Sequence, residues 1–135
     1  MSEAGFALQQ AVHACLAGDG ALAALLGEGA VHDVAPRAAA LPLVAVGEWS
    51  VVSLPAAGGP LHEHRFDLVV RSRAAGRREA QAIAARVEEL LDGAALAPAG
   101  HRLVDLAARG RLTRLARDGR TIEASIAFRA VSEPL

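Results

Sequence analysis

The chain has 135 residues, 53% of them hydrophobic, which is enough for one compact domain with a core and too short for two ordinary domains. We therefore expect a single domain over residues 1–135. Its 14 basic residues are all arginine, and with 15 acidic residues the formal net charge is −1. A near-neutral chain argues against nucleic-acid binding that depends on overall positive charge, although local basic patches remain possible.

The N-terminal segment predicts two helices. Ser2 is expected to cap a helix from about Glu3 to Ala17, and Asp19 is expected to cap a shorter helix that ends at Leu26. The single cysteine, Cys15, falls on the apolar side of the first helix, so we expect it to pack as a small hydrophobic residue. The segment lacks a basic region followed by an apolar core, and no apolar run is long enough to span a bilayer. We therefore expect a cytoplasmic protein without a membrane partner.

The next part of the chain predicts strands. Val31 to Val34 forms a short apolar-polar run, and Leu43 to Leu54 is rich in branched side chains. The segment Pro55 to Pro60 reads PAAGGP and predicts a loop, whose length suggests a tip that projects from the body. After it, His62 to Arg71 alternates in the period-two pattern of a half-buried strand. The loop is thus expected to join two strands.

The stretch from Gly76 to Gly93 predicts a clean amphipathic helix that carries no catalytic residue types. Its apolar positions recur at the three-and-four spacing of one helical face. These positions are Ala80, Ile83, Ala84, Val87, Leu90 and Leu91. We expect this helix to be a scaffold element that packs on a sheet.

The C-terminal part predicts further strands. His101 to Leu106 and Arg111 to Arg117 alternate, Asp118-Gly119 is a strong hairpin turn signal, and Thr121 to Val131 has the clearest alternation in the chain. The order of helices and strands, with hairpins at both ends, predicts an α+β domain. We expect an antiparallel β-sheet with helices packed on one face.

The sequence contains few residues arranged for chemistry. His62 and His64 lie two apart on one strand face, a spacing that can share a metal, and His101, or alternatively His32 or Asp33, could complete such a site. The simpler interpretation is that these histidines are solvated or lie at an interface. No activated nucleophile, phosphate loop or metal motif is found, so we expect no enzyme activity, no cofactor and no catalytic residues.

A dense group of arginines spans the two predicted C-terminal strands and their turn. The group comprises Arg109, Arg111, Arg114, Arg117 and Arg120. One interpretation is that these side chains are exposed and protect sheet edges from aggregation. The other is that they form ion pairs with a neighbouring subunit or line a passage for DNA.

Seven segments, in this order and spacing, resemble one family of proteins. They are Ala24 to Gly27, Val31 to Pro36, Leu41 to Val44, Val70 to Arg73, Gly76 to Leu91, Gly100 to Val104, and Asp118 to Thr121 before Phe128-Arg129. The family is that of the tail-completion, or tail-terminator, proteins of long-tailed phages and gene transfer agents, and the likeness runs nearly from end to end.

The resemblance implies a structural protein of the virion tail, assembled in the bacterial cytoplasm. It implies a homo-oligomeric ring, commonly a hexamer, that caps the head-proximal end of the tail tube and ends its growth. The implied partners are the tail tube protein, the head-tail connector or stopper, and DNA that passes through the lumen without sequence reading.

Two groups of residues are expected to make the contacts of such a ring. The loop region Leu54, Pro55, Gly58, Gly59 and Leu61 would meet the tube or a neighbour. The arginines Arg109, Arg111, Arg114 and Arg117 would form salt bridges or line the lumen. The alternatives are a small metal-dependent enzyme that uses His62, His64 and His101, and an oligomeric adaptor that is not part of a virion.

Overall fold

We describe residues 3–135 of the chain in a computed structural model. They form three helices and five strands in an α+β arrangement, as predicted. The elements in chain order are α1 (Ala4–Ala17), α2 (Gly20–Leu26), β1 (Val31–His32), β2 (Leu43–Leu54), β3 (Leu61–Ser72), α3 (Arg78–Leu91), β4 (His101–Leu115) and β5 (Ile122–Pro134). None of these helices is long and apolar enough to cross a membrane.

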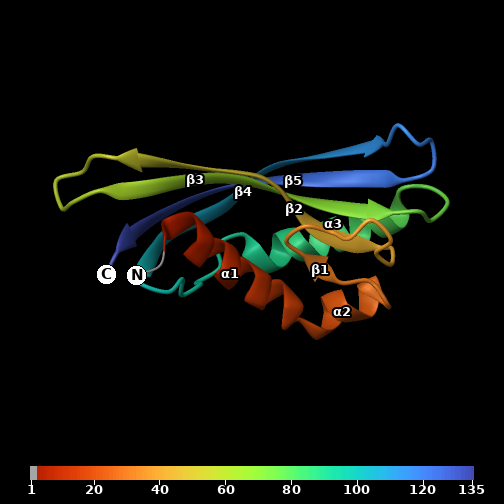
Figure 1. The fold of residues 1–135 in the computed structure, drawn as a ribbon, viewed down its shortest axis with the longest axis horizontal. Coiled ribbons are helices and arrows are strands. Elements are labelled where there is room, and N and C mark those ends of the chain that lie inside the picture. The colour runs from red at the N-terminus through yellow and green to blue at the C-terminus, as the bar shows by residue number, and fades with distance from the viewer. Residues whose placement is uncertain (1–2) are drawn as a thin grey trace.

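The five strands form one twisted sheet in the order β1-β2-β3-β5-β4, and all three helices cover the same face of it (Figure 1). The other face, here called the open face, has no covering element among the described residues. Pairing is antiparallel except at one edge, where Val31 and His32 run parallel to Val44 and Ala45. The prediction of helices on one face of an antiparallel sheet is therefore confirmed, with the correction that the sheet is mixed.

The first helix begins one residue later than predicted. The Glu3 carboxylate accepts hydrogen bonds of 2.9 Å from the backbone N–H groups of Gly5 and Phe6, so Glu3 acts as the N-cap. The predicted cap, Ser2, lies outside the described residues. The second cap is as predicted, because the Asp19 carboxylate accepts a 2.8 Å hydrogen bond from the backbone N–H of Leu22.

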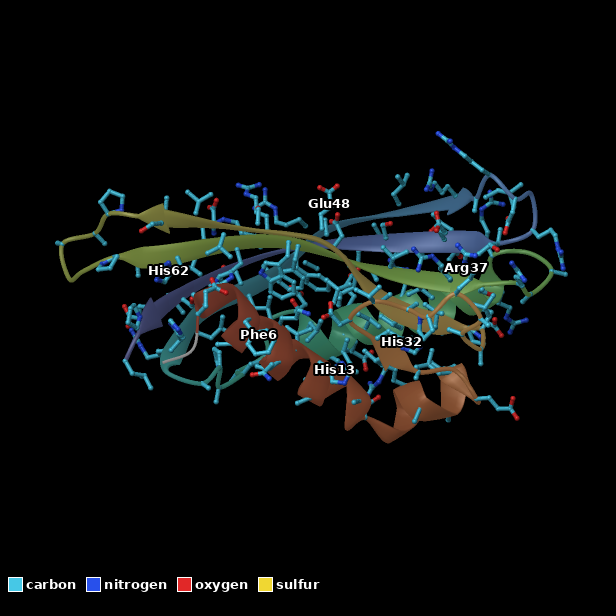
Figure 2. All side chains as sticks on the ribbon, in the orientation of Figure 1. Phe6, His13, His32, Arg37, Glu48 and His62 are labelled. Atoms are coloured by element: carbon cyan, nitrogen blue, oxygen red, sulfur yellow. The ribbon has the colours of Figure 1, made fainter. Side chains whose placement is uncertain are left out.

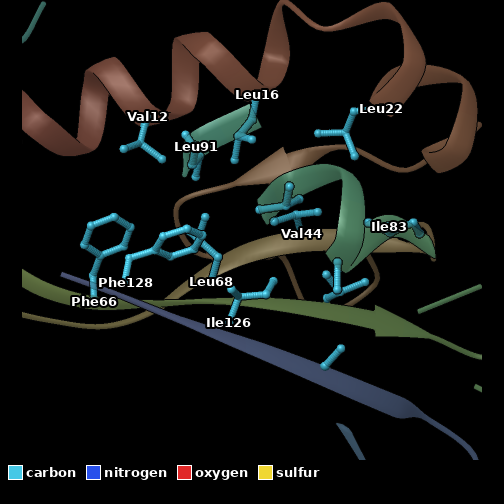
Figure 3. Packing of buried hydrophobic residues seen from close by; sticks show 14 of the residues in the cluster. Val12, Leu16, Leu22, Val44, Phe66, Leu68, Ile83, Leu91, Ile126 and Phe128 are labelled. Atoms are coloured by element: carbon cyan, nitrogen blue, oxygen red, sulfur yellow. The ribbon is translucent and has the colours of Figure 1, made fainter. Parts of the chain in front are cut away.

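The core lies between the helices and the covered face of the sheet (Figure 3). The apolar stripe of α3 is fully buried except for Leu90, which is partly buried. Two aromatic pairs cross the sheet: Trp49 stacks on Phe66 with ring centroids 4.0 Å apart, and Phe66 lies 5.2 Å from Phe128. Cys15 is partly buried beside this core, as expected, and its thiol lies 4.0 Å from the Leu90 carbonyl oxygen.

Two strands contain irregularities that a period-two pattern does not predict. In β2 the register shifts between Val46 and Trp49. Residues three apart on a regular strand face opposite sides, but this shift lets Trp49 face the helices together with Val46. In β4 the register shifts between Leu103 and Asp105 and again between Ala108 and Gly110. The two separate runs predicted for this region are therefore one continuous strand of 15 residues.

The connection between α2 and β1 requires a glycine at one position. A Cβ atom on Gly29 would lie 1.6 Å from the carbonyl oxygen of Pro42, far inside van der Waals contact. The backbone of the two segments can approach this closely only without a side chain.

Candidate interaction surfaces

The β2–β3 hairpin ends in an exposed tip without charged residues. Its loop covers the predicted residues Pro55 to Pro60, and its strands close with Leu54 opposite Leu61. A hydrogen bond of 3.1 Å from the Gly59 N–H to the Ala56 carbonyl oxygen forms the turn. Figure 1 shows that the tip extends beyond the end of the helices, so it has no helix beneath it. The tip thus projects from the body, as predicted.

The predicted arginine group does not form one cluster. Arg111 points toward the helices, where its guanidinium lies 3.3 Å from the Glu88 carboxylate of α3. Arg114 lies on the open face, 2.8 Å from Glu123. Arg109 is the extra residue at the β4 register shift, and Arg117 lies in the turn after β4; neither makes an ion pair with a described residue. The bulge at Arg109 changes which residues of β4 face the helices and which face the open side. The arginines on either side of the bulge therefore do not share one face.

Ion pairs between neighbouring strands cover much of the open face. The Glu63 carboxylate lies between Arg65 at 3.2 Å and Arg129 at 2.7 Å. Hydrogen bonds from Arg129 and then Arg65 lower the pKa of Glu63. Glu123 is bound in the same way by Arg71 at 3.0 Å and by Arg114. These pairs make the face polar.

Asp67 is an exception on this face. It makes no ion pair with any described residue, and burial together with the nearby Glu48 raises its pKa. Glu48 stands on the side of the sheet away from the helices (Figure 2). Both carboxylates border an open-sided hollow of about 740 Å³, which Arg65 and Arg109 also line. The centre of the open face is therefore concave and carries both signs of charge.

The three histidines of the proposed metal site are not arranged as ligands. His64 is fully buried, and both of its ring nitrogens are occupied: the Trp49 Nε1–H donates to Nδ1 at 3.4 Å, and Nε2 lies 2.9 Å from Ser132 Oγ. His62 and His101 instead contact each other edge to face, with ring centroids 6.0 Å apart. His32 and Asp33 line a separate hollow beside α1. Among residues 3–135, no three His, Cys, Asp or Glu side chains form a group that could hold a metal.

The hydrogen bonds of His64 explain its charge state. Because Nδ1 accepts from the indole, Nε2 must carry the proton and donate to Ser132, so the ring is neutral. Burial, with a smaller contribution from His62, lowers the pKa of His64 to about 4. His64 is thus a structural core residue, and the Trp49-His64-Ser132 contact was not expected from the sequence.

One further surface combines segments that are distant in sequence. The β1–β2 connection, the β3–α3 connection and the β4–β5 turn meet at the end of the sheet opposite the tip, where Figure 2 labels Arg37. The Arg73 Nε–H donates to Thr121 Oγ1 at 3.1 Å and links two of these segments. The three connections enclose a polar hollow of about 500 Å³ that Arg37, Arg71 and Arg73 line. Only strand order reveals this surface, because Arg37 is distant in sequence from Arg71 and Arg73.

Comparison with known proteins gives two informative matches. A sequence model of the family described as "Tail completion protein gp17" matches residues 10–133. A chain in a structure described as the virion of a native gene transfer agent (GTA) particle is 34% identical, with a TM-score of 0.87, and the match covers 98% of this chain and 99% of that one. A second solved structure shares the fold alone, at 16% identity and a TM-score of 0.54 over 96% of each chain. No curated protein sequence matches.

Proposed function

Because the chain belongs to the tail completion protein gp17 family, which is structural and not enzymatic, we propose that it forms a ring on the head-proximal end of a tail tube. The ring ends growth of the tube and joins the tail to the head connector of a phage or GTA particle. DNA passes through its lumen without sequence recognition. The observation that carries this proposal is the match, over nearly the whole of both chains, to a protein of a GTA virion.

The sheet topology supports a cyclic arrangement of copies. One side of β2 pairs with β3. On its outer side, β2 pairs with β1 only at Val44 and Ala45, so residues 46–54 have no strand on that side among the described residues. At the other edge, β4 is hydrogen-bonded at Leu106 by the Gly93 N–H and at Ala108 by Asp92, which leaves residues 109–115 without a strand on that side in the described chain. Edge strands of this kind can extend a sheet into a neighbour.

The strand directions are consistent with such an extension. Successive strands from β2 to β4 are antiparallel, so β2 and β4 run in opposite directions. When copies are related by rotation about an axis along the strands, β4 of one copy is antiparallel to β2 of the next. This contact is heterologous and closes into a ring if the rotation divides a full turn. We propose six copies, with Arg109 and Arg111 near the joined edges.

The hairpin tip supports a contact along the axis or with a neighbouring subunit. The segment Leu54 to Leu61 is uncharged and mostly exposed, and it has little of its own chain to pack against. Projecting apolar segments of this kind are typical of surfaces that a partner covers. We propose that Leu54, Pro55, Gly58, Gly59 and Leu61 contact the tail tube or an adjacent copy.

Deletion of residues 56–59 tests the role of the tip. The deletion removes the turn but leaves both strands and the core, so the monomer should fold while tails fail to join capsids. The substitution Gly20→Ala, outside the tip, is the control, because a Cβ there meets no atom within 4 Å. Normal joining and DNA delivery with the deletion variant would remove the tip from the mechanism.

Electron microscopy of purified particles tests the function itself. The proposal expects density for this chain as a ring where the tail meets the capsid. Particles that lack the chain altogether would instead favour the adaptor hypothesis, in which the protein acts outside the virion.

A further inference from the structure

The near-neutral charge of the chain conceals a strong separation of charge. The arginine end is defined here as residues 35–43, 71–79 and 114–123, the three segments that meet opposite the hairpin tip. It contains eight of the 14 arginines and three of the 15 carboxylates, a formal net charge of +5. The other residues carry six arginines and twelve carboxylates, a net charge of −6. Positive charge is thus concentrated at this end of the sheet.

Most of the positive charge at this end is not neutralised within the chain. Five of its arginines make no ion pair with a described residue, and three of these five are in the two connections that follow β3 and β4, while one begins α3 and one lies in the β1–β2 connection. The five are Arg37, Arg77, Arg78, Arg117 and Arg120. Outside the arginine end, Arg109 is the one described arginine that makes no ion pair with a described residue. Like charges kept this close repel one another unless an anionic group lies between them.

The start of α3 adds to the same potential. Its N-cap is Arg77, whose side chain makes no capping hydrogen bond, and Arg78 occupies the first turn. A helix N-terminus carries partial positive charge and is stabilised by Asp, Glu or a capping hydroxyl. Arginines at these positions oppose the helix dipole, and Glu79 is the one acid in the first turn that offsets them.

The carboxylates at this end favour a protein partner over DNA. Asp118 and Glu123 lie between the arginines, and their charges repel phosphates along a DNA backbone. A ring of six such ends around the lumen would carry about thirty excess positive charges. Such a ring would bind DNA tightly and slow its passage, which argues against placing the arginine ends at the lumen. Guanidinium groups bind carboxylates in bidentate geometry, and alternating signs of charge set the register of such a contact.

We propose that the arginine end docks on a carboxylate-rich surface of the head connector, since it lies opposite the hairpin tip that is proposed to contact the tail tube. This inference rests on the proposed function. Each copy contributes a weak, salt-sensitive contact, and the ring multiplies these contacts, so that docking is firm only when the ring is complete. The hollow lined by Arg37, Arg71 and Arg73 receives the partner's acidic side chains.

Co-sedimentation of the purified chain with tail tubes and, separately, with tail-free capsids tests the proposal over a range of salt concentrations. The variants are Arg78→Glu and Arg117→Glu, and the matched control is Arg65→Glu, which reverses an exposed arginine of the open face outside the arginine end. We expect each variant to weaken binding to capsids roughly tenfold or more and to leave binding to tail tubes unchanged, while the control binds capsids as the wild type does. Arg78→Glu should also raise the thermal midpoint, because it places an acid at the helix N-terminus.

The opposite signs of the two Arg78→Glu effects separate docking from folding, since a variant that loses binding through misfolding would not become more stable. Unchanged binding of both variants overturns the inference and leaves the ring function intact. Tighter binding of duplex DNA than of either component, lost in the same variants, overturns it in favour of a lumen role. Failure of the wild-type chain to bind tubes and capsids alike would contradict the proposed function itself.

Discussion

The buried His64 makes the stability of this protein depend on pH. Its pKa in the folded chain is about 4, against an ordinary value of 6.5, because burial disfavours the charged ring and the nearby His62 adds a smaller effect in the same direction. Between these two values the unfolded chain binds a proton that the folded chain does not. The contribution of neutral His64 to the free energy of unfolding is therefore complete above pH 6.5 and is lost as the pH falls toward 4.

The size of the effect follows from the shift. A difference of about 2.5 pKa units corresponds to roughly 3 kcal/mol, of which about 2 kcal/mol is already lost at pH 5. This is a large share of the 5–15 kcal/mol that typical domains have. Urea unfolding followed by the fluorescence of Trp49, the single tryptophan of the chain, measures the free energy of unfolding at each pH.

The variant His64→Gln keeps polar groups near Trp49 and Ser132 but does not titrate, so its stability should change much less between pH 7 and pH 5. His13→Gln, at an exposed position of α1, is the control and should keep the pH dependence of the wild type. Parallel stability profiles for the wild type and His64→Gln would refute the reasoning.

Three further predictions concern packing and capping. Gly29→Ala should lower the free energy of unfolding by about 1–3 kcal/mol, because the added Cβ meets a backbone carbonyl, whereas Gly20→Ala in the open first turn of α2 should be neutral or stabilising in the same urea titration. Arg86→Lys should lower the thermal midpoint measured by circular dichroism, since the bidentate contact with Asp19, at 2.7 and 2.9 Å, needs a guanidinium. Cys15 should react with iodoacetamide at pH 8 more slowly than a free thiol, because burial raises its pKa, and unfolding should abolish the difference.

The sequence predicted the elements well where a single face is buried. The apolar stripe of α3 and the alternation of β3 and β5 both follow from packing against one layer, so their periodicity appears directly in the residues. The hairpin tip was located because proline and glycine act locally on the backbone. By contrast, the sequence does not reveal the parallel contact of β1, since two residues carry too little pattern to define a direction.

The interaction surfaces were harder to predict for a physical reason. The alternation of arginines along β4 suggested one cluster, but the bulge at Arg109 changes which side chains share a face. The pairing of His64 with Ser132 joins residues 68 positions apart, and the arginine end joins three loops. Both depend on strand order, which no local pattern encodes. The contacts proposed for the tip and the arginines remain predictions.

The unlike ends of the sheet have a directional consequence. One end is a neutral, apolar hairpin, and the other is a set of cationic loops, with a stiff twelve-residue strand pair between them. Copies placed side by side in the same direction would give an assembly with one apolar rim, formed by the hairpin tips, and one cationic rim, formed by the arginine ends. The two rims of such an assembly would differ in chemistry, so each would bind a different neighbour. An inverted copy would place cationic loops beside apolar tips and would not fit between its neighbours.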